Sequence, residues 1–169
     1  MRALFPLPLL VGAALLTGCG GSAASSAPAS TASSQSVAAA PQVLPISSLE
    51  HDIASGKPVV LLFMAPGCVS CAAEATAATS AVGSHPGVDV VGVDMLSGDT
   101  PADLGSFLSA ANLDTLPMSW TVDVSGTLTA RYNVVNLGET VGLVHGIVRF
   151  HNVADADATL LGTEIARLS

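Results

Sequence analysis

Two cysteines three positions apart, Cys68 and Cys71, are the residues of this sequence best suited to chemistry. They follow an apolar run at 59–64 and a turn at Ala65-Pro66-Gly67, and an alanine-rich stretch that favours a helix comes after them. A strand that enters a helix through such a turn puts Cys68 at the helix N-terminus, where unpaired N–H groups and the helix dipole stabilise a thiolate. Cys71 then lies almost one turn further on, within reach of a disulfide. Because only a thiolate attacks a disulfide, this arrangement predicts thiol–disulfide exchange.

A zinc site and a purely structural disulfide are the alternative interpretations of this cysteine pair. A zinc site needs further ligands, and the sequence holds neither a second C-x-x-C motif nor an H-x-x-x-H motif. A structural disulfide usually closes a longer loop and rarely follows a buried strand directly. We therefore favour a redox-active dithiol that needs no metal and no other cofactor.

The first 18 residues resemble the signal peptide of a bacterial lipoprotein. Arg2 precedes an apolar run that is too short to span a membrane, and Leu16-Thr17-Gly18-Cys19 has the form of a lipobox. The resemblance implies cleavage before Cys19 and lipidation of its thiol, which would anchor the protein on the extracytoplasmic face of the cell membrane. An ordinary secretory signal followed by an unrelated cysteine is the alternative. In either case the remaining cysteine pair meets an oxidising compartment, where disulfides persist.

Composition separates a tether from a folded domain. Residues 19–42 are mostly Ser, Ala, Pro and Gly without a charged side chain, which is typical of a disordered linker. The folded domain is expected over 43–169. Removal of residues 1–18 takes away one of the 5 basic residues and none of the 13 acidic ones, which leaves a net charge of −9. Such a charge argues against nucleic acid as a partner and against adhesion to anionic lipid, so membrane attachment would depend on the lipid anchor.

Hydrophobic periodicity and turn residues predict a mixed α/β domain. Strands are expected at 58–64, 88–94, 117–122, 140–144 and 147–150, and helices at 47–56, 69–81, 101–111 and after Asp155. Residues 127–132 either close a hairpin or begin a helical turn. Ser47 and Glu50 match a capping box. Thr100 is expected to be an N-cap, with a proline at the first helical position and an acid, Asp103, at the third. Parallel strands joined by helices and followed by an antiparallel pair predict a mixed central sheet with helices on both faces.

With its C-x-x-C pair at the start of the first crossover helix, this architecture is similar to the thioredoxin fold. Residues 63–71 resemble a thioredoxin-superfamily active site, and Glu74 resembles the acid that TlpA-like extracytoplasmic members commonly have three residues after the second cysteine. The order of motifs at 107–108, 116–117, 122–123 and 132–134 follows the same branch. The resemblance implies that Cys68 attacks and Cys71 resolves. On a shared helix face, Glu74 could exchange a proton with Cys71; the alternative is a solvated carboxylate.

The sequence departs from the family at three places. Gly67 replaces the usual Trp before the first cysteine, and Leu62 replaces the buried acid of classical thioredoxins. The cis-proline loop that faces the disulfide in the family has two possible registers, at Pro117 or at Gly138. We favour the second register, in which Gly138 and Glu139 form the loop and two strands and a helix follow. The peptide before Gly138 is then expected to be trans, because a cis bond before a non-proline residue costs about 2.5–4 kcal/mol.

Four residues are therefore the candidate substrate-contacting positions: Gly67, Pro117, Gly138 and Glu139. For Glu139 the alternative is a surface acid. Several other polar or aromatic residues are expected to have structural roles. Asp94 is interpreted as a strand-end cap and Trp120 and Tyr132 as packing residues, while His51, His85, His145 and His151 are expected to face solvent.

The resemblance implies a membrane-anchored, extracytoplasmic oxidoreductase that acts on cysteines of exported proteins. Reductase activity, supplied by a membrane-embedded thiol donor, is the expected direction, and the Val69-Ser70 dipeptide leaves an oxidase open. A non-catalytic thioredoxin-fold module is the alternative from another class, in which the two thiolates hold a soft metal such as Cu(I).

Overall fold

The computed structural model describes residues 41–153 and 157–168. The predicted signal peptide at 1–18, Cys19, the tether up to residue 40 and Asp155 lie outside the described residues, so these remain predictions. No helix in the described ranges is long and apolar enough to cross a membrane.

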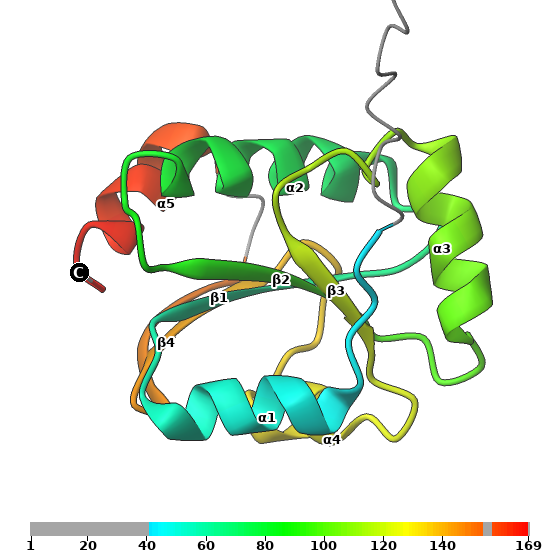
Figure 1. Cartoon of the computed structure of the whole chain (residues 1–169), viewed down its shortest axis with the longest axis horizontal. Helices are drawn as coiled ribbons and strands as arrows, with labels where there is room; N and C mark the ends of the chain where they lie inside the picture. Colours follow the sequence, from blue (N-terminus) through cyan, green and yellow to red (C-terminus); the bar gives the residue numbers. More distant parts are fainter. Residues whose placement is uncertain (1–40, 154–156, 169) are drawn as a thin grey trace, which may run out of the picture. The chain divides into compact units, whose positions relative to one another are not determined.

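A five-stranded mixed sheet lies between two layers of helices (Figure 1). The strands are β1 (Val59–Met64), β2 (Asp89–Asp94), β3 (Ser119–Val122), β4 (Thr140–Val144) and β5 (Ile147–Asn152), in the order β3-β2-β1-β4-β5. The helices are α1 (Ile46–Ser55), α2 (Val69–Val82), α3 (Pro101–Ala110), α4 (Thr127–Arg131) and α5 (Ala158–Ile165). β1 is central: it pairs in parallel with β2 and antiparallel with β4, and β3 is parallel to β2. The predicted mixed α/β fold with helices on both faces is confirmed.

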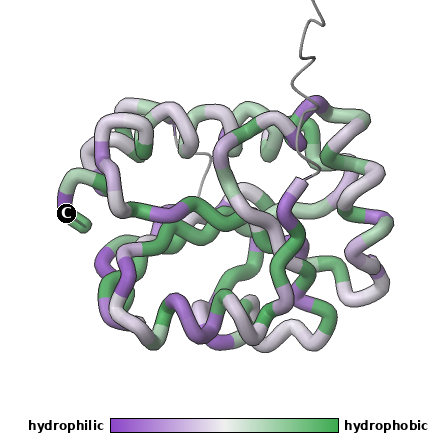
Figure 2. Tube along the Cα trace, viewed as in Figure 1, coloured by the Kyte–Doolittle hydropathy of each residue, from purple (hydrophilic) through white to green (hydrophobic). Residues whose placement is uncertain are grey.

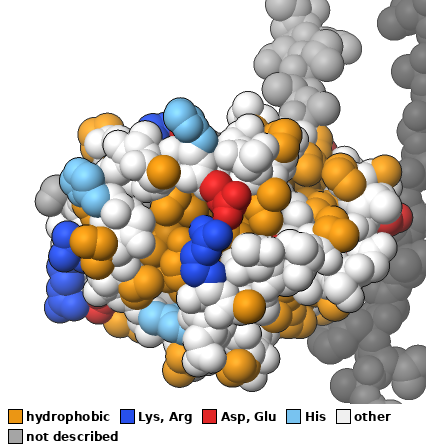
Figure 3. Space-filling view, turned by 90° about the horizontal axis from the view of Figure 1, so that it is seen from below, with side chains coloured by type: hydrophobic (Ala, Val, Ile, Leu, Met, Phe, Trp, Pro, Cys, Tyr) orange, Lys and Arg blue, Asp and Glu red, His pale blue; other side chains and the backbone are white. Residues whose placement is uncertain are grey.

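The six residues of the central strand β1 are all apolar (Figure 2), and all are buried, so the strand is covered on both faces. Val59, Leu61 and Phe63 pack against α1 and α4, in a cluster that includes Leu49 and Leu128. The alternate residues face α2, α3 and α5, as expected from the two-residue period of a strand. Seen from the side of α1 and α4, the surface carries few charged side chains (Figure 3), in keeping with a charged fraction of 11%.

Glycine lets one large aromatic side chain enter the core. Trp120 is fully buried, as predicted, and its ring occupies the space that a Cβ on Gly92 of the neighbouring strand would need. The chain just before α1 lies alongside the same strand, because the Leu44 N–H donates to the Trp120 carbonyl at 2.7 Å. Tyr132 is also buried, as predicted.

Two predicted helix caps are wrong in position. α1 starts at Ile46 with Pro45 as its N-cap, so Ser47 falls inside the first turn and makes no capping box. α5 is capped by Asp157, whose carboxylate accepts from the Leu160 N–H at 2.8 Å. The predicted N-cap Thr100 of α3 is confirmed, and Asp103 completes a capping box with it. Residues 127–131 form the helix α4, which decides between the two possibilities left open by the sequence.

Candidate active site

A tight turn delivers Cys68 to the start of α2. The Cys68 N–H donates to the Ala65 carbonyl at 3.1 Å, with Pro66 and Gly67 as the two central residues. Gly67 has φ +87°, which suits the third position of a type II turn and favours glycine there. Gly67 is exposed beside the cysteines, as its predicted role requires. Cys68 is the N-cap of α2, so the predicted place of this cysteine at a helix N-terminus is confirmed.

The two cysteines form a disulfide with a Cα–Cα distance of 5.4 Å. Cys71 is completely buried, whereas Cys68 is only half-buried. The Cys71 N–H donates to Cys68 Sγ at 3.3 Å, and Ser70 Oγ lies 3.5 Å from the same sulfur. These groups and the helix dipole favour negative charge on Cys68 once the disulfide is reduced. The two sulfurs are therefore unequal in exposure and in electrostatic surroundings.

Glu74 lies inside the protein rather than in solvent, with only 4% of its surface exposed. It is on α2 three residues after Cys71, a spacing that puts both side chains on one face of the helix. A Cβ on Gly138 would come within 2.7 Å of both carboxylate oxygens of Glu74. The interpretation of Glu74 as a solvated carboxylate is therefore wrong, and its carboxyl group lies between the cysteine helix and the loop before β4.

That loop is joined to the end of β1 just before the cysteine turn. The Gly138 N–H donates to the Phe63 carbonyl at 2.8 Å, and the Phe63 N–H donates to the Glu139 carbonyl at 2.9 Å. No peptide bond within the described ranges is cis, so the peptide before Gly138 is trans, as expected. Gly138 has φ +86°, a value that favours glycine. The backbone of Gly138 is thus hydrogen-bonded to the end of β1, close to the turn that carries Cys68.

Pro117 lies at the other end of the sheet. It lines a surface pocket together with Lys57, Val88 and Asp89, where β1 and β2 begin. The cysteines follow the end of β1, so the length of the strand separates Pro117 from them. The prediction that Pro117 contacts substrate at the disulfide is therefore wrong in position.

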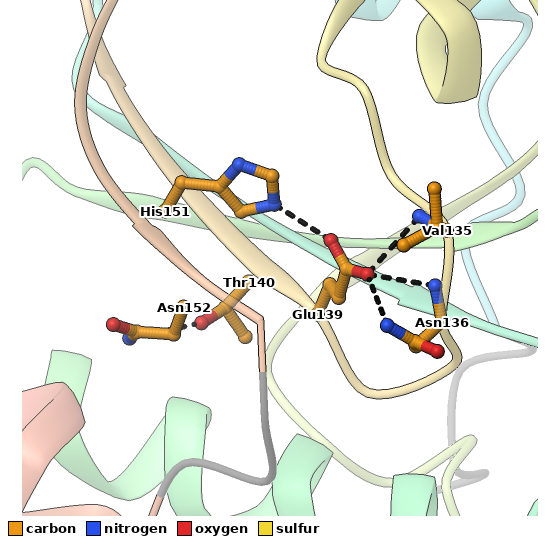
Figure 4. Close-up of polar contacts among 6 residues, drawn as sticks. All are labelled: Val135, Asn136, Glu139, Thr140, His151 and Asn152. Atoms are coloured by element: carbon orange, nitrogen blue, oxygen red, sulfur yellow. Dashed lines mark hydrogen bonds and ion pairs between the residues drawn. The ribbon is translucent and has the colours of Figure 1, made fainter.

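Glu139 is fully buried and makes its polar contacts within the fold (Figure 4). Its Oε1 accepts from the N–H groups of Val135 and Asn136 at 3.0 and 2.7 Å, and from Asn136 Nδ2 at 3.0 Å. Its Oε2 lies 2.7 Å from His151 Nε2 on β5. Burial would raise the pKa of Glu139, but the hydrogen bonds from Val135, His151 and Asn136 outweigh burial and leave the pKa below its usual range.

Two predictions change with these contacts. The Glu139 side chain is fully buried and bonded to Val135, Asn136 and His151, so neither its predicted contact with substrate nor the alternative of a surface acid holds for the side chain. His151 was expected to face solvent, yet its ring binds the carboxylate and is only 24% exposed. Neither His151 nor Asn136 carries a sequence signal for this role, because their meeting depends on the β4–β5 register and on the course of the loop.

Asp94 closes β2 at the same end of the sheet as the disulfide. It pairs with Met64 at the end of β1, and its Oδ1 accepts from the Leu96 N–H at 3.1 Å, which confirms the predicted strand-end cap. Burial, followed by the nearby charges of Asp99 and Asp103, raises the pKa of Asp94 to about 6. This shift has no signature in the sequence.

Within the described residues, no group of three or more His, Cys, Asp or Glu side chains could hold a metal ion. The sulfur pair is the chemically distinctive feature of this region, and disulfide exchange is the chemistry that it can perform directly.

No known family model and no curated protein matches the chain, whereas many solved structures do. The dsbF protein of MTB, solved in mixed oxidized and reduced forms, is 28% identical over 68% of this chain and 82% of its own, with a TM-score of 0.57. A secreted disulfide oxidoreductase of Mycobacterium tuberculosis, homologous to E. coli DsbE, is 28% identical over 66% and 82%, with a TM-score of 0.53. A thioredoxin-like protein from Aeropyrum pernix matches over 72% and 94% at 18% identity, with a TM-score of 0.57, which shows the fold. The predicted thioredoxin-like fold and enzyme class are confirmed.

Proposed function

We propose that this thioredoxin-like thiol–disulfide oxidoreductase is a lipid-anchored, extracytoplasmic reductase of disulfides in exported proteins. The observation that carries the chemistry is the pair of unequal sulfurs. A half-exposed Cys68 caps α2, and a completely buried Cys71 is bonded to it. Such a pair supplies one sulfur that a substrate can reach and a second that only the first can reach.

The reaction starts from the reduced dithiol. The Cys68 thiolate attacks one sulfur of a substrate disulfide, forms a mixed disulfide and releases the other substrate sulfur as a thiolate. Cys71 then loses its proton and attacks Cys68 Sγ, which releases the second substrate thiolate and closes the disulfide seen in the structure. Two electrons pass from the dithiol to the substrate disulfide. A thiol donor must then reduce Cys68–Cys71 before the next cycle.

Glu74 is the proposed partner of Cys71 in proton transfer. Cys71 is shielded from water, so its proton needs an acceptor inside the protein when it attacks. The buried Glu74 carboxylate lies three residues further along α2 on the same helix face, which makes it the candidate acceptor. In the reverse direction the same group returns the proton.

The location and the direction rest on the N-terminal sequence and on the resemblance to TlpA-like proteins. A lipidated Cys19 followed by the predicted linker at 20–42 would hold the domain near the membrane while letting it reach substrates within about 25–30 Å. An oxidising compartment oxidises the dithiol, so a reductase there depends on a membrane-embedded thiol donor. The M. tuberculosis oxidoreductase described as secreted supports a location outside the cytoplasm.

Redox titration in glutathione buffers and an insulin-reduction assay test the chemistry together. Wild-type protein is expected to cycle between dithiol and disulfide and to reduce insulin. Cys68→Ser is expected to lose turnover completely, whereas Cys71→Ser should trap a mixed disulfide with substrate through Cys68. The rate of oxidation of reduced ribonuclease is compared with the rate of insulin reduction at matched protein concentrations. This comparison distinguishes a reductase from an oxidase.

Insulin reduction by Cys68→Ser, or a mixed disulfide trapped through Cys71 instead of Cys68, would contradict the assigned roles. Faster oxidation of ribonuclease than reduction of insulin at matched concentrations would overturn the reductase direction. Tight Cu(I) uptake by the reduced protein without any disulfide turnover would replace the enzyme with a soft-metal carrier.

A further inference from the structure

The loop before β4 contains two adjacent residues that face different parts of the molecule. The side chain of Glu139 turns toward Val135, Asn136 and His151. The side of Gly138 where a Cβ would stand faces the Glu74 carboxylate. The turn at Gly138, with φ +86°, separates the two directions, so one short stretch contacts both the β4–β5 hairpin and the cysteine helix.

Glycine at this position gives the loop no rigidity of its own. A proline ring would fix φ, whereas glycine adopts positive and negative φ about equally readily. The structure shows another restraint on the same loop: a buried carboxylate that accepts three hydrogen bonds from the segment just before Gly138 and meets His151 from β5 (Figure 4). Hydrogen bonds to an ionised acceptor are the strong ones, so this restraint holds the loop in one arrangement.

We propose that Glu139 is a positioning residue for disulfide exchange. Its carboxylate holds the loop so that the Gly138 backbone stays against Glu74, and this contact fixes the Glu74 carboxyl group on the helix face that it shares with Cys71. The proposal rests on the proposed function and extends it to a residue whose hydrogen bonds all lie outside the cysteine turn. His151 is the second part of the restraint, since it holds the other carboxylate oxygen. Glu139 acts through Glu74.

The consequence of loosening the loop is specific. A displaced Gly138 leaves room in which the Glu74 carboxyl group moves and meets water, so its electrostatic influence on the Cys71–Cys68 pair changes. A purely architectural role for Glu139 would lower thermal stability and leave the acid–base behaviour of the cysteines unaltered. The two roles therefore differ in a quantity other than stability.

The test is a double-mutant cycle read out by the pH dependence of cysteine alkylation in the reduced full-length protein. The midpoint of iodoacetamide reaction at Cys68 is measured for wild type, Glu139→Ala, Glu139→Gln, Glu74→Gln and the double variants. Glu50→Gln is the matched control, because Glu50 also has a basic partner, Arg131 at 2.7 Å, but lies at the surface on α1. Glu139→Ala is expected to shift the midpoint by about half a pH unit or more, and Glu139→Gln in the same direction by less.

In the Glu74→Gln background the same Glu139 substitutions are expected to have no further effect on the midpoint, because the group through which they act is gone. Additive shifts in the two backgrounds would overturn the proposal, and so would Glu139 variants with a lower Tm and a wild-type midpoint. Should Glu139→Ala not fold, the isosteric Glu139→Gln carries the comparison alone. If the Glu139 and Glu74 substitutions are coupled as expected but the protein never exchanges disulfides with glutathione, the proposed function is refuted. The positioning of Glu74 by Glu139 then still stands.

Discussion

Gly138 and Glu74, far apart in the chain, lie so close together that a methyl group on Gly138 would come within 2.7 Å of both Glu74 carboxylate oxygens. Glycine at this position therefore does two things. It allows φ +86° and it leaves space for a buried acid on the cysteine helix. The loop at Gly138 and the Glu74 side chain are in close contact, so a change in the position of one must displace the other.

Gly138→Ala tests this relationship. We expect a loss of unfolding free energy of about 2–4 kcal/mol, from the strained φ and from crowding of Glu74. Gly67→Ala is the matched control, because Gly67 has φ +87° but nothing within 4 Å of an added Cβ, so it should lose only about 1–2 kcal/mol. Urea denaturation of both variants measures the difference. Equal losses would mean that the contact with Glu74 has no energetic weight.

Asp94→Asn is expected to stabilise the protein above neutral pH. The folded pKa of about 6 exceeds the ordinary 3.8, so the Asp94 contribution is fully present below pH 3.8 and is lost as pH rises through about 6. The buried charge then costs on the order of 2–3 kcal/mol, which asparagine avoids while still accepting from the Leu96 N–H. Unfolding free energies at pH 8 and pH 4 measure the gain, with the surface variant Glu50→Gln as control. A gain of equal size at both pH values would contradict the raised pKa of Asp94 as the cause.

Glu139→Gln is expected to show the opposite pH dependence. The pKa of Glu139 lies below its ordinary value of 4.5, so its stabilisation is present above pH 4.5 and is lost as pH falls through the folded pKa. At pH 7 the substitution should cost about 1–3 kcal/mol, because a charged acceptor of several hydrogen bonds is replaced by a neutral one. The cost should shrink in denaturation experiments as pH falls below 4.5. A cost that grows toward acid pH would refute the assignment.

The strongest local patterns in the sequence predicted the elements correctly. The apolar run at 59–64, the alanine-rich helix after Cys68 and the N-cap at Thr100 each depend on residues close together in the chain. The two misplaced caps show the limit of such patterns. Asp155 and Asp157 are equally good capping residues two positions apart, and local chemistry does not distinguish them.

The parts of the site that were missed depend on residues that meet only in the folded chain. His151 reaches Glu139 because β5 pairs with β4 across a bulge after Gly142, a register that no sequence pattern marks. Gly138 was placed in the loop from the order of motifs, but its contact with Glu74 needs the packing of α2 on the sheet. Pro117 was misassigned because a proline before a strand has the same sequence appearance at either end of a sheet.

Cys19→Ala tests the anchor, which lies outside the described residues. In a bacterial host the wild-type protein is expected to fractionate with membranes and to incorporate a labelled fatty acid, because a lipobox cysteine receives the lipid. The variant should lose the label and appear in the soluble exported fraction or retain an uncleaved signal. Cys68→Ala, which leaves the lipobox intact, is the control. Unchanged labelling of Cys19→Ala would exclude lipidation at this residue.

The most direct measurement of the central claim is the pH dependence of iodoacetamide reaction at each cysteine of the reduced protein, with the adduct located by mass spectrometry. The claim is that α2 makes Cys68 both reachable and easily ionised. We expect modification at Cys68 with a midpoint well below the value of about 8.5 for a free thiol, and slow modification of Cys71. Preferential reaction at Cys71, or a Cys68 midpoint at or above that of a free thiol, would contradict the account.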